Sequence, residues 1–110
     1  MNIDSTYQNG YRVISVKDHI GIYTDIGELV TIVEQVLQQN ETRIAFSFTD
    51  KSYLYSNAIR VIMQCFELIK EKEGKLVLVQ PNDEILSTFN VLDLDSVIEI
   101  FPTMDDLINS

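Results

Sequence analysis

Short apolar segments with the two-residue period of strands alternate along this chain with longer segments whose apolar residues recur at helical spacing. In residues 43–48, Ile44, Phe46 and Phe48 fall on one face of a strand and Ala45 on the other. Residues 75–79 are apolar at nearly every position, which is typical of a central strand covered on both faces. The pattern predicts five strands, with the short second one pairing with the first: residues 11–16, 20–23, 43–48, 75–79 and 97–101.

Helical spacing predicts four helices between and after these strands. Asp25 and Glu28 have the spacing of a capping box at the first helix, and Thr103 and Asp106 have it at the last. Gly74 ends the second helix. The predicted helices start at residues 24–25, 56–57, 81–83 and 103, and they end at residues 40, 73, 89 and 108.

The order of these elements is that of an α/β domain. Strands joined by helices are expected to be parallel and to have right-handed crossovers. We therefore expect a single domain over residues 1–110, with a mainly parallel sheet of four to five strands and about four helices. Four apolar side chains are expected to share one core between the sheet and the helices: Phe46, Ile62, Phe66 and Val77.

The charge balance restricts the partners that the chain can bind. Its 110 residues include 17 acidic and 8 basic ones, for a net charge of −9. This charge repels nucleic acid and anionic lipid surfaces, so we expect neither as a partner. No apolar run approaches the length of a membrane span and no signal segment opens the chain, which predicts a cytoplasmic protein without direct membrane insertion.

Few side chains offer catalytic chemistry. His19 is the one histidine and lies in a predicted loop, and Cys65, the one cysteine, lies in the apolar part of a helix, where a buried inert thiol is expected. Residues 93–96 (DLDS) lack the glycine and distal glutamate of a calcium loop, and the four glycines are too scattered for a phosphate-binding loop. We therefore expect a protein-binding module with no enzymatic activity, cofactor or metal.

The junction between the third strand and the second helix, residues 48–59, is the most informative segment. A helix that starts directly after a parallel strand exposes backbone N–H groups and the positive end of its dipole. Ser56 and Asn57 are good residues for such a helix start. The sequence therefore predicts an anion-binding or partner-docking point here, although capping alone also accounts for these two residues.

In element order and local phrases, residues 11–108 resemble the STAS family, which includes bacterial anti-sigma factor antagonists and the tails of sulphate transporters. Residues 22–24 (IYT) resemble the family's entry to the first helix, residues 74–79 (GKLVLV) its glycine-led fourth strand, residues 81–82 (PN) the following turn, and residues 91–101 its ending. The family's signature at the second helix is Asp-Ser-(Ser/Thr)-Gly. Its second hydroxyl residue is phosphorylated by a partner kinase that is also the anti-sigma factor.

This chain departs from that signature at the positions that matter for phosphorylation. Tyr55 stands in place of the aspartate, Ser56 matches the first serine, Asn57 replaces the phosphorylated residue and Ala58 replaces the glycine. Acidic residues of the family are also replaced elsewhere, by Gly21 and Ser47. The resemblance therefore implies a helix start without the usual phosphoserine switch, and leaves Ser56 as a candidate phosphorylation site.

Two functions remain open at this point. The first is a regulatory module that binds an anti-sigma factor or kinase-like regulator, as a monomer or weak dimer. The alternative is a cytoplasmic STAS subunit of a lipid or anion transport complex. In either case, the broad apolar arc of the second helix and an arginine near its start suggest the partner-binding residues: Tyr55, Ser56, Asn57, Ala58, Arg60, Val61 and Leu68.

Overall fold

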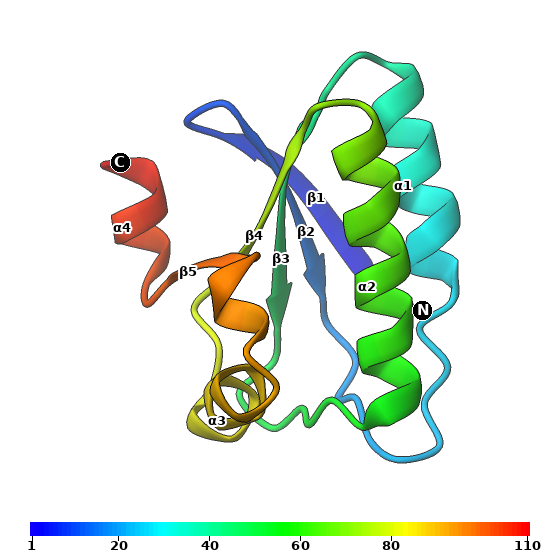
Figure 1. The fold of residues 1–110 in the computed structure, drawn as a ribbon, viewed down its shortest axis with the longest axis vertical. Coiled ribbons are helices and arrows are strands. Elements are labelled where there is room, and N and C mark those ends of the chain that lie inside the picture. Colours follow the sequence, from blue (N-terminus) through cyan, green and yellow to red (C-terminus); the bar gives the residue numbers. More distant parts are fainter.

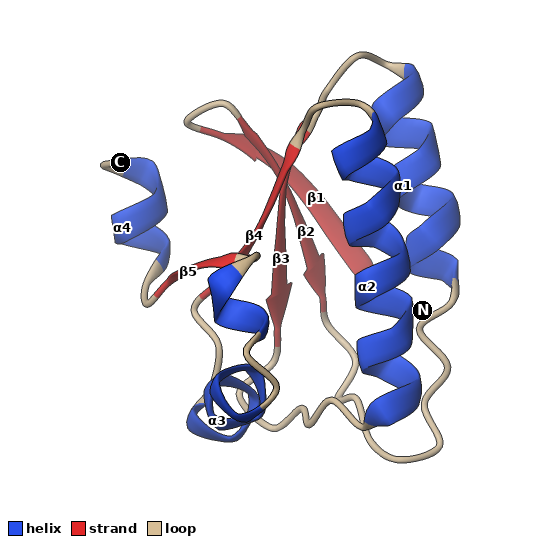
Figure 2. Ribbon diagram, viewed as in Figure 1, coloured by secondary structure: helices blue, strands red, loops and turns tan.

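The computed structural model describes all 110 residues and forms one five-stranded sheet with helices on both faces (Figure 1). The strands lie across the sheet in chain order: β1 (Ile3–Gln8), β2 (Tyr11–Val16), β3 (Arg43–Phe48), β4 (Lys75–Val79) and β5 (Glu99–Phe101). Only β1 is antiparallel to its neighbour. The helices are α1 (Glu28–Gln38), α2 (Ser56–Glu71), α3 (Asp83–Val91) and α4 (Met104–Ile108), and a short 3₁₀ helix, η1 (Leu94–Ser96), precedes β5 (Figure 2). The predicted α/β class and mainly parallel sheet are confirmed.

The strand that pairs with β2 is not the predicted one. Residues 20–23 form a loop, and the partner of β2 is β1, which the strand analysis missed. Asn9 and Gly10 join the two strands in a tight turn, with φ of 49° and 87°. These left-handed values are those of a two-residue hairpin turn, so the Asn-Gly pair fixes the register from Gln8 and Tyr11 onward.

Two apolar clusters lie on opposite faces of the sheet. The larger cluster includes Phe46 and Ile62 and fills the space beneath α1, α2 and α3. The smaller one contains Val77 and Leu107 and lies beneath α4. The prediction that Val77 shares a core with Phe46 is wrong, because alternate residues of β4 point to opposite faces. Phe66 is only half-buried, on the flank of the larger cluster.

The short helix α4 is held in place by the β1–β2 turn. The side-chain amide of Asn9 donates hydrogen bonds to the carbonyls of Leu107 (2.9 Å) and Ser110 (3.1 Å). The predicted capping box of Thr103 and Asp106 is present and starts the helix. Because Leu107 is fully buried, these contacts seal the smaller cluster.

Several element boundaries differ from the predicted ones. Helix α1 starts at Glu28 because the Asp25 carboxylate accepts the N–H of Gly27 (2.8 Å), which forms a turn in place of the predicted capping box. Helix α2 ends at Glu71, and the left-handed residue after it is Glu73 (φ 57°). Strand β5 starts two residues late because the N–H groups of Val97 and Ile98 both donate to the carbonyl of Leu94, in the turn that closes η1.

Candidate functional site

Three loops meet at the carboxyl edge of the parallel strands: residues 17–27, 49–55 and 80–82. Ser52 joins the first two and is 1% exposed. Its hydroxyl accepts the N–H of Ile20 (2.8 Å) and shares a hydrogen bond with the Thr49 hydroxyl (2.8 Å). The N–H of Tyr53 donates to the Ile20 carbonyl (2.8 Å). The two loops are therefore held in one arrangement before any partner binds.

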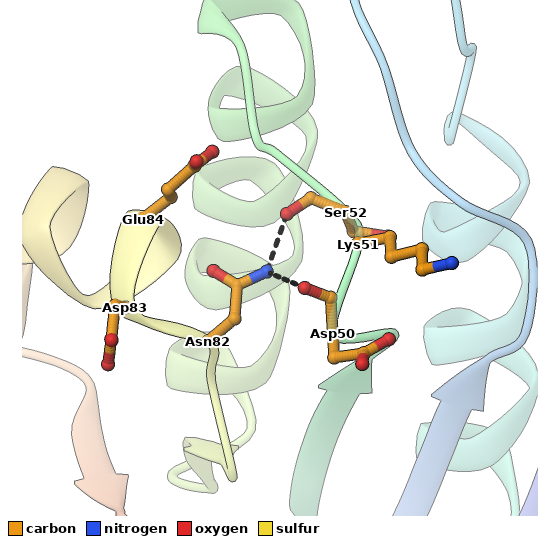
Figure 3. A pocket seen from close by; sticks show the side chains of 6 residues that line it. All are labelled: Asp50, Lys51, Ser52, Asn82, Asp83 and Glu84. Carbon is orange, nitrogen blue, oxygen red and sulfur yellow. Dashed lines mark hydrogen bonds between the residues drawn. The ribbon is translucent and has the colours of Figure 1, made fainter.

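Asn82 joins the third loop to the second (Figure 3). Its side-chain amide donates to the carbonyls of Asp50 (3.0 Å) and Ser52 (2.7 Å), while its oxygen accepts the N–H of Ile85 (2.8 Å) and caps α3. The shallow hollow around Asn82 is lined by Asp50, Lys51, Ser52, Asp83 and Glu84. Three carboxylates against one ammonium make the hollow unsuitable for a phosphate.

The start of α2 follows the loop of Ser52 in the chain and carries the residues singled out from the sequence. Tyr55 is the N-cap, and its side chain makes no capping hydrogen bond. Ser56 and Asn57 are exposed, and the Asn57 amide reaches the carbonyl of Thr24 (3.5 Å). Ala58 is 1% exposed, so it contributes packing and no surface. No acidic residue lies in the first turn, so its free N–H groups and positive dipole end are not neutralised by the helix itself.

Exposed apolar side chains surround this helix start. Tyr23 is 94% exposed and Ile22 55%, in the loop that Asn57 contacts, and Tyr55 is 39% exposed. The Tyr55 ring packs edge-to-face on Tyr53, with centroids 4.6 Å apart. We call Ile22, Tyr23 and Tyr55 the tyrosine patch. Ile22 and Tyr23 were not predicted as surface residues because the apolar run 20–23 was taken for a strand, although Gly21 interrupts it.

The other predicted docking residues are more spread out. Arg60 is exposed, makes no salt bridge and lies one turn beyond Ser56, so it is not in the first turn of α2. Leu68 is half-buried and lines a hollow with Glu34 and Leu37 of α1. Val61, seven residues earlier on the same helix flank, is also half-buried. The apolar arc of α2 is therefore largely used by contact with α1, and Val61 and Leu68 offer little surface.

The side chains considered for chemistry are placed as follows. His19 is exposed, and its Nδ1 lies 2.8 Å from the Thr49 hydroxyl. Cys65 is buried in the larger cluster, and this burial raises the pKa of its thiol to about 12. No group of three or more histidine, cysteine or acidic side chains is arranged to hold a metal ion. No helix has the length and apolar character that crossing a bilayer requires.

Proteins of known structure share this architecture. A search of curated proteins finds no match. Among solved structures, TM1081 of Thermotoga maritima, described as a candidate anti-sigma factor antagonist, superposes with a TM-score of 0.71 at 16% identity over 97% of this chain and 92% of its own. SpoIIAA, a Bacillus cell fate determinant solved in its phosphorylated form, gives 0.67 at 10% identity over 98% and 97%.

These identities are low enough that the superpositions show the fold alone. The family model of the STAS domain, however, matches residues 10–107, which is nearly the whole chain. The match includes β2 to β5 and all three loops of the candidate site. The chain therefore belongs to the STAS family.

Proposed function

We propose that this chain is a non-enzymatic regulatory module of the cytoplasm that binds an anti-sigma factor or kinase-like regulator through the start of α2 and the tyrosine patch. The observation that supports this most is the position of Tyr23 and Tyr55 beside an uncovered helix N-terminus. Tyrosine is enriched among the residues that dominate binding energy at protein interfaces, because its rigid ring buries a large area and its hydroxyl still makes a hydrogen bond.

Hydrogen bonding within the site supports the same proposal. Ser52 and Asn82 fix the loops that carry Tyr23 and Tyr55, so little conformational entropy is lost when a partner docks. Arg60 adds an unpaired cation on a chain of net charge −9. A partner with a basic surface and a carboxylate placed for Arg60 fits this distribution of charge.

Regulation by phosphate at position 57 is not part of the proposal. Asn57 has no hydroxyl group, whereas the amide that replaces it contacts the backbone of the neighbouring loop. Ser56 is the one hydroxyl residue in the first turn of α2 and is exposed. A phosphate there would add about 1.5 to 2 negative charges at the positive end of the helix dipole, which α2 tolerates.

Phosphopeptide mapping tests this point. After incubation with a partner kinase, the wild-type chain is expected to carry phosphate on Ser56 or nowhere, and Asn57→Ser is expected to gain a modified residue at position 57. Because that substitution changes only an exposed side chain, the fold should be retained. Strong phosphorylation of Thr49 or Ser52 in the folded protein contradicts the proposal, since Ser52 is buried and both hydroxyls serve to hold the loops.

The docking surface is tested by charge reversal. Arg60→Glu is expected to weaken binding to the partner by at least tenfold, or about 1.4 kcal/mol, and to leave the unfolding temperature unchanged. Wild-type and variant chains are used as bait in lysate of the native cell, the retained protein is identified by mass spectrometry, and its affinity is then measured by calorimetry with purified protein.

Lys72→Glu is the matched control because it makes the same charge change at the opposite end of α2, where Lys72 is exposed. The control should bind as the wild type does. Equal losses for the two variants would indicate a general charge effect and no specific surface. Retention of transporter subunits, in place of an anti-sigma factor, would support the transport-complex function.

A further inference from the structure

The edge strand β1 leaves a row of backbone groups without partners. The N–H of Lys17 donates to the Asn2 carbonyl (2.8 Å), so these two residues form a hydrogen-bonded pair of the β1–β2 ladder. In an antiparallel ladder, hydrogen-bonded pairs alternate with pairs that make no hydrogen bond to each other. In this register, the N–H and C=O groups of Asp4, Thr6 and Gln8 therefore point toward β2. The N–H and C=O groups of Ile3, Ser5 and Tyr7 point outward from the sheet.

We propose that this edge pairs with β1 of a second copy of the chain, antiparallel and centred on Ser5. Around that centre, Ser5 faces Ser5 of the other copy, and Ile3 faces its Tyr7. Every outward N–H and C=O of Ile3, Ser5 and Tyr7 then has a partner within the strand. Shifting the register by two residues in either direction moves at least one of these three opposite a residue outside β1, so the Ser5 centre satisfies the edge best.

The side chains agree with this register. Ile3, Ser5 and Tyr7 all point to the helix face of the sheet, because their cross-strand partners Val16 and Ile14 belong to the larger cluster. Tyr7 is 57% exposed. A hollow beside Ile3, between β1 and α1, is lined by Ile32 and Val36. The Tyr7 ring of the second copy, placed opposite Ile3, covers the mouth of this hollow.

Charge opposes a second copy less at this edge than over the rest of the surface. Two chains of net charge −9 repel each other over most of their surfaces. Beside β1, however, the Asp4 carboxylate lies 3.7 Å from the Lys17 ammonium, and Arg12 forms a two-point contact with Glu41 at 2.8 and 2.9 Å. The hydrogen bonds from Arg12 lower the pKa of the Glu41 carboxyl, so both side chains stay ionised and their charges cancel.

The opposite edge of the sheet is a poorer candidate, because β5 has only 3 residues. In contrast, β1 has 6 residues with one charged side chain and no proline, and so lacks the usual features that protect an edge strand. An interface made of one strand and a few side chains falls below the roughly 1,000 Å² of a stable complex. We therefore expect a weak dimer that is populated at high protein concentration.

Disulfide trapping tests the register. In Ser5→Cys, the two cysteines lie about 5.5 Å apart between Cα atoms, within the range that a disulfide spans. Mild oxidation of this folded variant is expected to give a covalent dimer on non-reducing gels. Cys65 does not interfere, because it is buried. Thr6→Cys and Tyr7→Cys are the controls. In the proposed register, the cysteine at either position faces a different residue of the other copy, two or more residues along the strand from the cysteine there. Cross-linking of either control as strongly as Ser5→Cys would overturn the register.

A second measurement tests the pairing without a cross-link. The sedimentation coefficient of the wild-type chain is expected to rise with concentration, whereas that of Ser5→Pro stays at the monomer value. Proline at position 5 removes an outward N–H and the long hydrogen bond from Arg12 to the Ser5 hydroxyl (3.5 Å), so the β1–β2 ladder is kept and the circular dichroism spectrum should be unchanged. If Ser5→Pro proves unfolded, Ser5→Lys replaces it, because a charge at the centre of the pairing also blocks the edge. A wild-type chain that stays monomeric at all concentrations and resists trapping at position 5 would overturn the proposal.

Discussion

Phe46→Ala is expected to lower the free energy of unfolding by about 3–5 kcal/mol, the range for removing a buried aromatic side chain. Phe46 lies in the middle of β3, the central strand, and is 2% exposed. Its ring packs edge-to-face on Phe48, with centroids 6.3 Å apart. Because domains of this size are stable by only about 5–15 kcal/mol, the variant should unfold at a much lower urea concentration, measured by circular dichroism.

Phe66→Ala is the matched control, since it removes the same atoms from the flank of the same cluster. Phe66 is half-buried, so less apolar surface returns to water and the loss should be clearly smaller than at Phe46. The sequence pattern predicted that both residues lie in one core. Equal losses at the two positions would favour that expectation over the arrangement described above.

The elements predicted with correct boundaries are those whose own residues determine them. Strands β3 and β4 match the predicted ranges because both are buried on both faces, which leaves an apolar pattern that no helix would give. The capping box at α4 was also predicted correctly, since it depends on two side chains three residues apart.

Strand β1 could not be found in this way. Its sequence, IDSTYQ, contributes little to either cluster, and most of its residues are exposed. What holds it is backbone hydrogen bonding to β2, which the Asn9-Gly10 turn brings into register. Asn-Gly is a hairpin-turn sequence, but only the strand that follows it, residues 11–16, was predicted. A hairpin turn implies a strand on both sides, even where the residues of one strand are mostly polar.

The candidate site shows the same difference between local and long-range information. Tyr55, Ser56 and Asn57 are neighbours in sequence, so a predicted helix start was enough to bring them together. Tyr23 is brought near them by the contact of Asn57 with Thr24, which joins α2 to a loop 33 residues earlier in the chain. For Val61 and Leu68, the helical wheel identified an apolar flank correctly. A wheel does not distinguish a partner protein from a neighbouring element: Leu68 lines a hollow with α1, and both side chains pack against the larger cluster.

Gly74→Ala is expected to cost about 2–3 kcal/mol of unfolding free energy, the upper part of the usual range for overpacking, because the added carbon has no room. A Cβ at this position would lie 2.2 Å from the backbone carbonyl oxygen of Thr42 and 2.9 Å from a methyl carbon of Ile69. That carbonyl accepts the N–H of Lys75 (2.9 Å), where β4 starts, so the backbone must shift at the point where α2 leads into the sheet. Urea unfolding of purified variants measures the loss.

Gly21→Ala is the control, since nothing lies within 4 Å of a Cβ there. Its stability should be unchanged or higher by up to about 1 kcal/mol, through the reduced entropy of the unfolded chain. If Gly74 served only as the left-handed residue that ends α2, its replacement would cost about 1 kcal/mol, the lower end of the penalty for a side chain in that conformation. The left-handed residue is Glu73, however, so Glu73→Gly should be tolerated while Gly74→Ala is not. A loss of 1 kcal/mol or less for Gly74→Ala would show that the helix end, and not the contact with Thr42, explains this glycine.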